Sequence, residues 1–325
     1  MVPESVSRAL LVAGGLVVGL VAVETAARLT WTQPWHQRLQ EEQQQAESLP
    51  YRFNSLGLRD REVGFDKPNG VVRLLVLGDS FTFGQGVASG AAVFPRRLER
   101  ALNHDAGPSA ASLFEVLNGG LAGSVTADWL ALWRQVGIPW QPDAVLVVFF
   151  LRDGTRTASI PQFFGPVHEK ITARNQASPF YRYLYVYRLV RDRLDRRAIT
   201  NAYLAEFHAA YFGSYDHTAE WRAAQRNLRA LFSECRERAI PVGIAVFPVL
   251  AALDDTYPFR PISELLLAWA RAEGVPAHDL LPAFLGRDAS RLWVSPWDQH
   301  PNAEAHGIAA ESLLPFARSL LSDNG

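Results

Sequence analysis

The sequence brings an acid and a hydroxyl together where an apolar run ends. Residues 71–86 are VVRLLVLGDSFTFGQG, so Gly78, Asp79 and Ser80 directly follow a mostly apolar run. A serine hydroxyl is almost wholly protonated near neutral pH and needs a neighbouring base before it can attack an electrophile. The tripeptide alone also fits a non-catalytic role, in which the serine caps the following helix.

A histidine that could act as this base stands near the end of the chain. In SPWDQHPNAEAHGIAAE, residues 295–311, His300 lies in a proline-containing loop two residues after Asp298. A carboxylate beside an imidazole can fix its tautomer and stabilise the charge that it acquires during catalysis. Ser80, His300 and Asp298 are therefore candidates for nucleophilic catalysis, whereas His306 falls inside the last predicted helix and is interpreted as a structural or surface residue.

Short apolar runs alternate with helical patterns and would position these side chains. Strands are predicted at 72–77, 114–117, 144–150, 242–247 and 275–278, and helices at 93–102, 127–136, 221–238, 262–272 and 303–320. The alternation indicates an α/β fold, a doubly wound parallel five-stranded sheet flanked by helices. Ligands of such sheets bind at the carboxyl ends of the strands, which is where Ser80 is expected.

Four blocks in order resemble the SGNH, or GDSL-type, hydrolases, and in particular their membrane-anchored bacterial branch. They are YRFNSLGLRDREV with KPNGVVRLLVLGDSFTFGQGV, VLNGGLAGSV, PDAVLVVFFLRD and DQHPN. The likeness covers most of residues 51–320. It implies a flavodoxin-like SGNH fold and the chemistry of a serine ester hydrolase or acyltransferase that forms an acyl-serine and needs no cofactor.

The resemblance also implies roles for the residues at matching positions. Ser80 would be the nucleophile, His300 the general base and then acid, and Asp298 its orienting partner. In the commonest family pattern the acid precedes the histidine by three residues, a place that Trp297 holds here, so the chain resembles branches with the shorter spacing.

The oxyanion would be held, by the same resemblance, by the backbone amides of Ser80 and Gly123 and by a side chain of the third block. At that position Arg152 replaces the family's asparagine. Its guanidinium could stabilise an oxyanion, bind an anionic substrate, or form a salt bridge with Asp79 or Asp153 that blocks the third donor.

Three further residues are predicted to support the site. Asp79 is interpreted as an anchor of its loop through backbone amides. Asn54 and Arg59, in the segment NSLGLRD, are expected to form a turn beside the site, with a substrate contact by Arg59 as the alternative. The histidines and acids lack metal-ligand spacing, and Cys235, the single cysteine, is expected to be an inert thiol.

The amino terminus resembles a membrane anchor. Residues 9–23, ALLVAGGLVVGLVAV, carry no charge, and residues up to 29 could extend them if Glu24 lies near the interface. A bilayer core needs about 20 apolar residues. We interpret residues 1–32 as a transmembrane helix that contacts the bilayer through 9–29, with a cleaved signal peptide as the alternative. A polar stalk at 33–50 and an α/β domain at 51–325, with an insertion at 154–218, complete the predicted organisation.

Two functions remain open. The first is a single-pass enzyme of the bacterial inner membrane whose domain faces the periplasm or cell exterior and acts on an ester, with O-acylated extracellular glycan as the class that the resemblance suggests. The second is an inactive SGNH-like binding or structural subunit of a membrane assembly, motivated by Arg152 and the aromatic insertion. Nucleic acid is excluded as a partner because a net charge of -1 provides no attracting field.

Overall fold

The structure is a computed structural model that describes residues 4–31, 51–107, 113–155, 160–216, 218–295 and 298–322. The chain forms two compact units. The smaller comprises residues 1–41 and 158–205, and the larger comprises residues 42–157 and 206–325. The predicted stalk at 33–50 and Trp297 lie outside the described residues.

The larger unit is built on a parallel five-stranded sheet in the order β2-β1-β3-β4-β5. The strands are β1 (Val71–Gly78), β2 (Leu113–Gly120), β3 (Ala144–Phe150), β4 (Val242–Phe247) and β5 (Ala277–Asp279). All seven residues of β3 are buried, because a parallel strand covered on both faces must be apolar throughout. The predicted doubly wound sheet is therefore confirmed.

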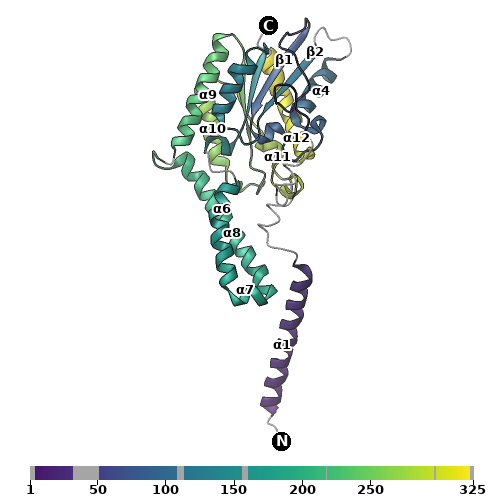
Figure 1. The fold of residues 1–325 in the computed structure, drawn as a ribbon, viewed down its shortest axis with the longest axis vertical. Coiled ribbons are helices and arrows are strands. Elements are labelled where there is room, and N and C mark those ends of the chain that lie inside the picture. The colour runs from purple at the N-terminus through teal and green to yellow at the C-terminus, as the bar shows by residue number, and fades with distance from the viewer. Residues whose placement is uncertain are drawn as a thin grey trace. The chain divides into compact units, whose positions relative to one another are not determined.

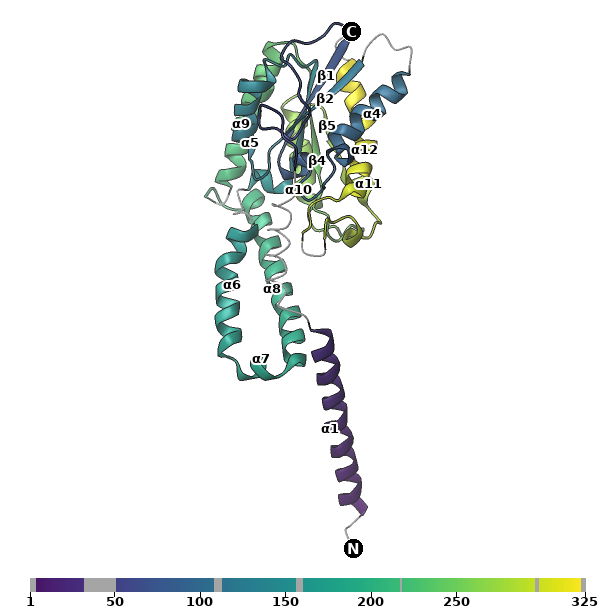
Figure 2. The same cartoon turned by 45° about the vertical axis from the view of Figure 1, so that its right-hand side comes forward.

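Helices cover both faces of this sheet. Figure 2 shows α4 and α12 on one side and α5 and α9 on the other. Their bounds, with that of α10, are α4 (Phe94–Ala106), α5 (Thr126–Leu132), α9 (Ala219–Glu237), α10 (Arg260–Ala272) and α12 (Ala303–Ser322). The helix predicted at 127–136 ends earlier as an α-helix and continues as a π-helical turn, Trp133–Gly137.

Short helical turns join these elements near the carboxyl ends of the strands. They are α3 (Ser80–Phe83) and α11 (Leu281–Phe284), and the 3₁₀ turns Gly90–Ala92, Leu151–Gly154 and Ala289–Arg291. The core between sheet and helices is rich in fully buried aromatic side chains, among them Trp129, Trp133, Phe149, Phe232, Phe247 and Phe284. The rigid packing of such a core lets the loops above it hold side chains in fixed positions.

The smaller unit is helical. It contains α1 (Glu4–Thr30), α6 (Ile160–Ala177), α7 (Pro179–Tyr183) and most of α8 (Tyr185–Phe212). Both views show α6 and α8 side by side (Figures 1 and 2), and an ion pair of 2.5 Å joins Arg174 to Asp195 between them. The insertion predicted at 154–218 is thus mainly a helical hairpin with α7 at its tip.

Helix α1 contains a segment, Leu11–Thr30, that is long and apolar enough to cross a membrane by length and composition. Only 6% of this segment is buried. A signal sequence passes the same test of length and composition, but the core helix of a soluble protein would be mostly covered.

Candidate active site

Strand β1 leads directly into α3, and this junction presents Ser80. Asp79 is the N-cap of α3, because its Oδ1 accepts a hydrogen bond of 2.8 Å from the Phe81 amide. The aspartate therefore makes the cap that a serine often makes, and the Ser80 hydroxyl is available for other contacts. Gly78 permits the tight junction, since a Cβ there would lie 2.8 Å from the Val148 carbonyl oxygen.

The structure brings Ser80, His300 and Asp298 together. His300 Nε2 lies 3.0 Å from Ser80 Oγ, and His300 Nδ1 lies 2.5 Å from Asp298 Oδ1. The same carboxylate oxygen accepts the His300 backbone amide at 3.1 Å. All three residues belong to the larger unit, in which Ser80 and Asp298 are buried. A hydroxyl, an imidazole and a carboxylate thus form one continuous chain of contacts.

The loop that carries His300 is fixed on both sides. The His300 carbonyl accepts from the Val294 amide at 2.9 Å. Asn302 donates to the carbonyls of Arg291 and Trp293, while its Oδ1 accepts from the first amides of α12 at 3.0 and 3.1 Å. Because one side chain ties the loop to the helix, the imidazole is oriented before any substrate binds.

The electrostatics keep Asp298 ionised. Burial raises the pKa of Asp298, but hydrogen bonds and attraction from His300 outweigh that effect, so the pKa lies below its usual value. A carboxylate that is charged at neutral pH can stabilise an imidazolium formed at His300.

The loop that follows β2 lies against the junction that presents Ser80. The Leu121 amide donates to the Gly78 carbonyl at 3.0 Å, which places the loop after β2 against the β1–α3 junction. In this loop Gly123 is exposed and has a φ of 75°, a left-handed conformation that favours glycine. Ser80 opens α3, where first-turn amides have no intrahelical acceptor.

The guanidinium of Arg152 forms an ion pair with Asp79, the residue before the nucleophile. Its Nη2 lies 3.4 Å from Asp79 Oδ2, and Ser80 Oγ lies 3.2 Å from the same oxygen. Asp153 instead accepts the Phe150 amide at 2.8 Å, and burial, followed by repulsion from Asp79, raises its pKa well above the usual value. Of the two salt-bridge partners considered from the sequence, the structure places Asp79 against Arg152.

Asn54 and Arg59 lie in a turn joined to the α3 segment. Asn54 Oδ1 accepts from the Leu58 amide at 2.9 Å. Arg59 is buried, donates to the carbonyls of Gly84 and Val87, and lies 4.3 Å from the centre of the Tyr51 ring. The guanidinium thus binds the chain that follows α3, a packing role.

Sequence reasoning missed the aromatic side chain beside the imidazole. The ring of Phe81 lies 5.6 Å from that of His300 and stacks on Phe150 at 4.0 Å. The only signal in the sequence was the position of Phe81 directly after Ser80. Its ring packs beside the imidazole and supports its orientation.

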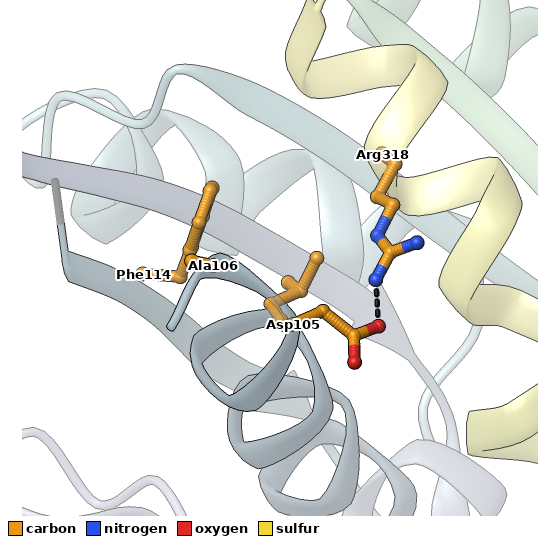
Figure 3. A pocket seen from close by; sticks show the side chains of 5 residues that line it. Asp105, Ala106, Phe114 and Arg318 are labelled. Atoms are coloured by element: carbon orange, nitrogen blue, oxygen red, sulfur yellow. Dashed lines mark ion pairs between the residues drawn. The ribbon is translucent and has the colours of Figure 1, made fainter. Parts of the chain in front are cut away.

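A separate surface pocket lies away from these residues. Figure 3 shows Asp105 and Arg318 paired at its rim, and the lining residues are Leu102, Asp105, Ala106, Phe114 and Arg318. Phe114 is the second residue of β2, whereas Ser80 follows the end of the parallel strand β1, so pocket and candidate site lie at opposite ends of the strands. Within the described ranges, no cluster of histidine, cysteine or acidic residues could hold a metal ion.

The sheet order, the strand-end serine and the histidine before the last helix are the features of an SGNH-type α/β fold. The model of the GDSL-like Lipase/Acylhydrolase family matches residues 76–308, and the chain belongs to this family. No curated protein matches the sequence significantly.

Solved structures of esterases resemble the chain at low identity. An acetylxylan esterase from Geobacillus stearothermophilus shares 17% identity at a TM-score of 0.46, covering 77% of this chain and 94% of the other. The protein TesA shares 16% at a TM-score of 0.46, covering 76% and 99%. A two-domain esterase active on acetylated mannans shares 14% at a TM-score of 0.41, covering 78% and 50%.

Proposed function

We propose that the protein is a serine ester hydrolase or O-acyltransferase that works through an acyl-serine at Ser80. One observation carries the proposal, namely the chain of contacts in which His300 joins Ser80 Oγ at 3.0 Å to Asp298 Oδ1 at 2.5 Å. This arrangement activates a hydroxyl in serine hydrolases on unrelated folds, because it depends on geometry and not on sequence order.

The proposed reaction has two halves. In the first, His300 Nε2 takes the Ser80 proton while Oγ attacks the ester carbonyl, and the resulting imidazolium then protonates the departing alkoxide. In the second, His300 takes a proton from water or an acceptor hydroxyl, whose oxygen attacks the acyl carbonyl. The imidazolium then gives that proton to Ser80 Oγ as the bond between Oγ and the acyl group breaks. Asp298 remains ionised throughout and stabilises the imidazolium.

The negative charge of the tetrahedral intermediate needs donors close to Ser80. The amides of Ser80 and Gly123 are the proposed backbone donors, supported by the position of the Leu121–Gly123 loop against the β1–α3 junction. Arg152 is the proposed third donor, because its guanidinium and the nucleophile contact the same oxygen of Asp79. Loss of one such donor commonly lowers turnover about 100- to 1,000-fold.

The test compares the full chain with Ser80→Ala and His300→Ala. Both variants should lose p-nitrophenyl acetate hydrolysis, and Ser80→Ala should also lose covalent labelling by a fluorophosphonate. Ser290→Ala is the matched control. Ser290 lies in a 3₁₀ turn and contacts Asp288, so the variant should leave both readouts unchanged. Wild-type turnover or labelling by Ser80→Ala would refute the assignment.

We further propose that α1 anchors the enzyme in a bacterial inner membrane, with the α/β unit outside the cytoplasm. The exposed apolar segment Leu11–Thr30 and the resemblance to the membrane-anchored branch support this. Protein extracted from membranes should then keep its first 31 residues, as measured by intact mass, and should resist carbonate extraction.

The resemblance also suggests O-acylated extracellular glycan as substrate. Release of acetate from acetylated polysaccharide by the purified enzyme would test this.

The ion pair between Arg152 and Asp79 supports a second candidate, an inactive binding or structural subunit. If this pair keeps the guanidinium from the oxyanion, the fold persists without turnover. Esterase turnover that depends on both Ser80 and His300 would exclude this candidate as the whole function. Its absence, together with co-purification of membrane partners in detergent, would favour it.

A further inference from the structure

A charged side chain ties the end of α1 to the tip of the α6–α8 hairpin. Glu24 accepts hydrogen bonds from the amides of Tyr185 at 2.8 Å and Val186 at 3.0 Å, the first two residues of α8. Since the first amides of a helix lack intrahelical acceptors, Glu24 caps α8 from a distant segment. Arg28 pairs with Glu24 at 3.0 Å and donates to the Tyr183 carbonyl at 2.9 Å.

Aromatic rings and an arginine surround this joint. Trp31 lies edge-to-face with Tyr181 at 6.5 Å and with Tyr185 at 6.4 Å. The Arg188 guanidinium lies 4.2 Å from the centre of the Tyr185 ring. Tryptophan, tyrosine and arginine concentrate at the membrane–water interface, where an apolar body and a polar end are both satisfied. The joint stands near the carboxyl end of the candidate span Leu11–Thr30, with Trp31 directly after it.

The hairpin also presents an exposed apolar surface, which we name the tip surface. The exposed fraction is 61% for Phe180 and Tyr183 and 54% for Val190. On α8, Tyr187, Val190 and Leu194 follow one another at spacings of three and four, so they form a stripe about 10 Å long on one helix face. The tip surface comprises Phe180, Tyr183, Leu184, Tyr187, Leu189, Val190 and Leu194.

The charge around the tip surface is positive. Residues 178–197 contain six arginines and two aspartates. Both aspartates are buried: Asp192 accepts from the Tyr181 hydroxyl, and Asp195 pairs with Arg174. Among the described side chains of this segment, Arg182, Arg193 and Arg197 are exposed, as are the apolar side chains of the tip surface. This combination complements anionic lipid headgroups, which attract each nearby basic residue by about 1 kcal/mol.

We propose that the tip surface is a membrane-binding site that inserts among the headgroups of anionic phospholipids. The inference rests on the proposal that α1 spans the bilayer, because Glu24 and Arg28 place the tip beside the end of that helix. Apolar side chains of an interfacial helix insert about 5–10 Å into the headgroup region. The hairpin would then be held at the bilayer by two contacts, the cap by Glu24 and the lipid around the tip surface.

The experiment uses the full chain in vesicles of phosphatidylcholine with phosphatidylglycerol. In a Cys235→Ser background, single cysteines carry a nitrobenzoxadiazole fluorophore at Tyr183→Cys, Val190→Cys, Leu20→Cys and Glu237→Cys. Quenching by shallow and deep doxyl lipids is compared with quenching by aqueous iodide. Leu20→Cys reports on α1, and Glu237→Cys, exposed at the end of α9, reports on water.

We expect shallow doxyl lipid to quench Tyr183→Cys and Val190→Cys at least threefold more than Glu237→Cys, with iodide giving the reverse order. Replacing the mixed vesicles by vesicles of pure phosphatidylcholine should reduce that lipid quenching about twofold. Adding the two substitutions Arg182→Gln and Arg193→Gln to the labelled variants should have the same effect. If iodide quenches both tip positions as strongly as Glu237→Cys while lipid still quenches Leu20→Cys, the inference about the tip surface is overturned and the proposed anchor stands. Shielding of the tip from both quenchers would also overturn it, since protein would then cover the surface. Iodide access at Leu20→Cys would refute the anchor itself.

Discussion

At the scale of single residues, the spacing between acid and histidine is shorter than in the commonest pattern of the resembling family. Asp298 precedes His300 by two residues, yet its Oδ1 accepts from both the ring and the backbone amide of His300. The turn closes because Ser295 Oγ accepts the Asp298 amide at 3.0 Å. The pairing of acid and base therefore depends on how the loop closes and does not require a three-residue spacing.

Asp298→Asn should lower kcat for p-nitrophenyl acetate by about 1,000- to 10,000-fold. The amide nitrogen of asparagine donates to Nδ1 and leaves the proton on Nε2, so the imidazole cannot accept the Ser80 proton. Stopped-flow or steady-state kinetics measures the loss. The control is Asp288→Asn, an exposed cap of a 3₁₀ turn, which should retain full turnover. A fall of less than tenfold in Asp298→Asn would show that the carboxylate does not orient the base.

Arg152→Met, which removes every side-chain donor, should separate an oxyanion donor from a plain ion pair. If the guanidinium stabilises the transition state, kcat falls about 100-fold while KM changes little. Asp79→Asn provides the comparison, because it removes the ion pair and keeps both the guanidinium and a cap acceptor for the Phe81 amide. Equal kcat in wild type and Arg152→Met would leave the two backbone amides as the whole oxyanion site.

At the scale of elements, a close approach between β2 and α3 positions the nucleophile. A Cβ at Gly120 would lie 2.1 Å from the Phe83 amide nitrogen and 2.5 Å from the Thr82 carbonyl carbon, so only glycine fits. The apolar runs and their spacing predict the strands and most helices, since both depend on local pattern. They do not predict this approach, because it is a contact with the backbone of an element distant in sequence. The sequence does not predict the contact of Phe81 with His300 either, because these two residues are also distant in sequence.

Gly120→Ala should destabilise the protein by about 1–3 kcal/mol and reduce turnover, because the added methyl group pushes α3 and Ser80 away from His300. Chemical denaturation and esterase kinetics measure the two effects. Gly90→Ala is the matched control, since a Cβ at Gly90 meets nothing within 4 Å. Unchanged stability and turnover in Gly120→Ala would mean that α3 tolerates displacement.

At the scale of the whole molecule, the sequence predicted the α/β unit better than the hairpin. Apolar strands and the order of the blocks determine a sheet whose topology has few alternatives. Residues 154–218 carry aromatic and basic side chains without a clear one-sided pattern. At the hairpin tip, Tyr185 contacts Trp31 and Glu24, whereas Phe180 and Tyr183 are exposed. The role of Glu24 was hidden because a cap supplied by a distant segment leaves no local signature.

The stability of the larger unit should depend on a histidine outside the proposed reaction. His306 is fully buried in α12, where Nδ1 accepts the Phe94 amide at 3.2 Å. Burial, followed by the charges of Arg59 and Arg97, lowers the pKa of His306 to about 3. In the unfolded chain its pKa is about 6.5, so between these values only the unfolded state binds the proton. The free energy of unfolding must therefore decrease as the pH falls through this range.

His306→Gln should remove this pH dependence. Each pH unit below 6.5 costs the wild type about 1.4 kcal/mol through this residue, so the change from pH 7 to pH 5 amounts to about 2 kcal/mol. Urea denaturation of both proteins in detergent at the two pH values measures the difference. The variant loses the stacking of His306 on Phe94 and starts from a lower stability, but the comparison concerns only the change with pH. An equal change in both proteins would show that His306 is protonated in the fold, and that the amide of Phe94 is satisfied in another way.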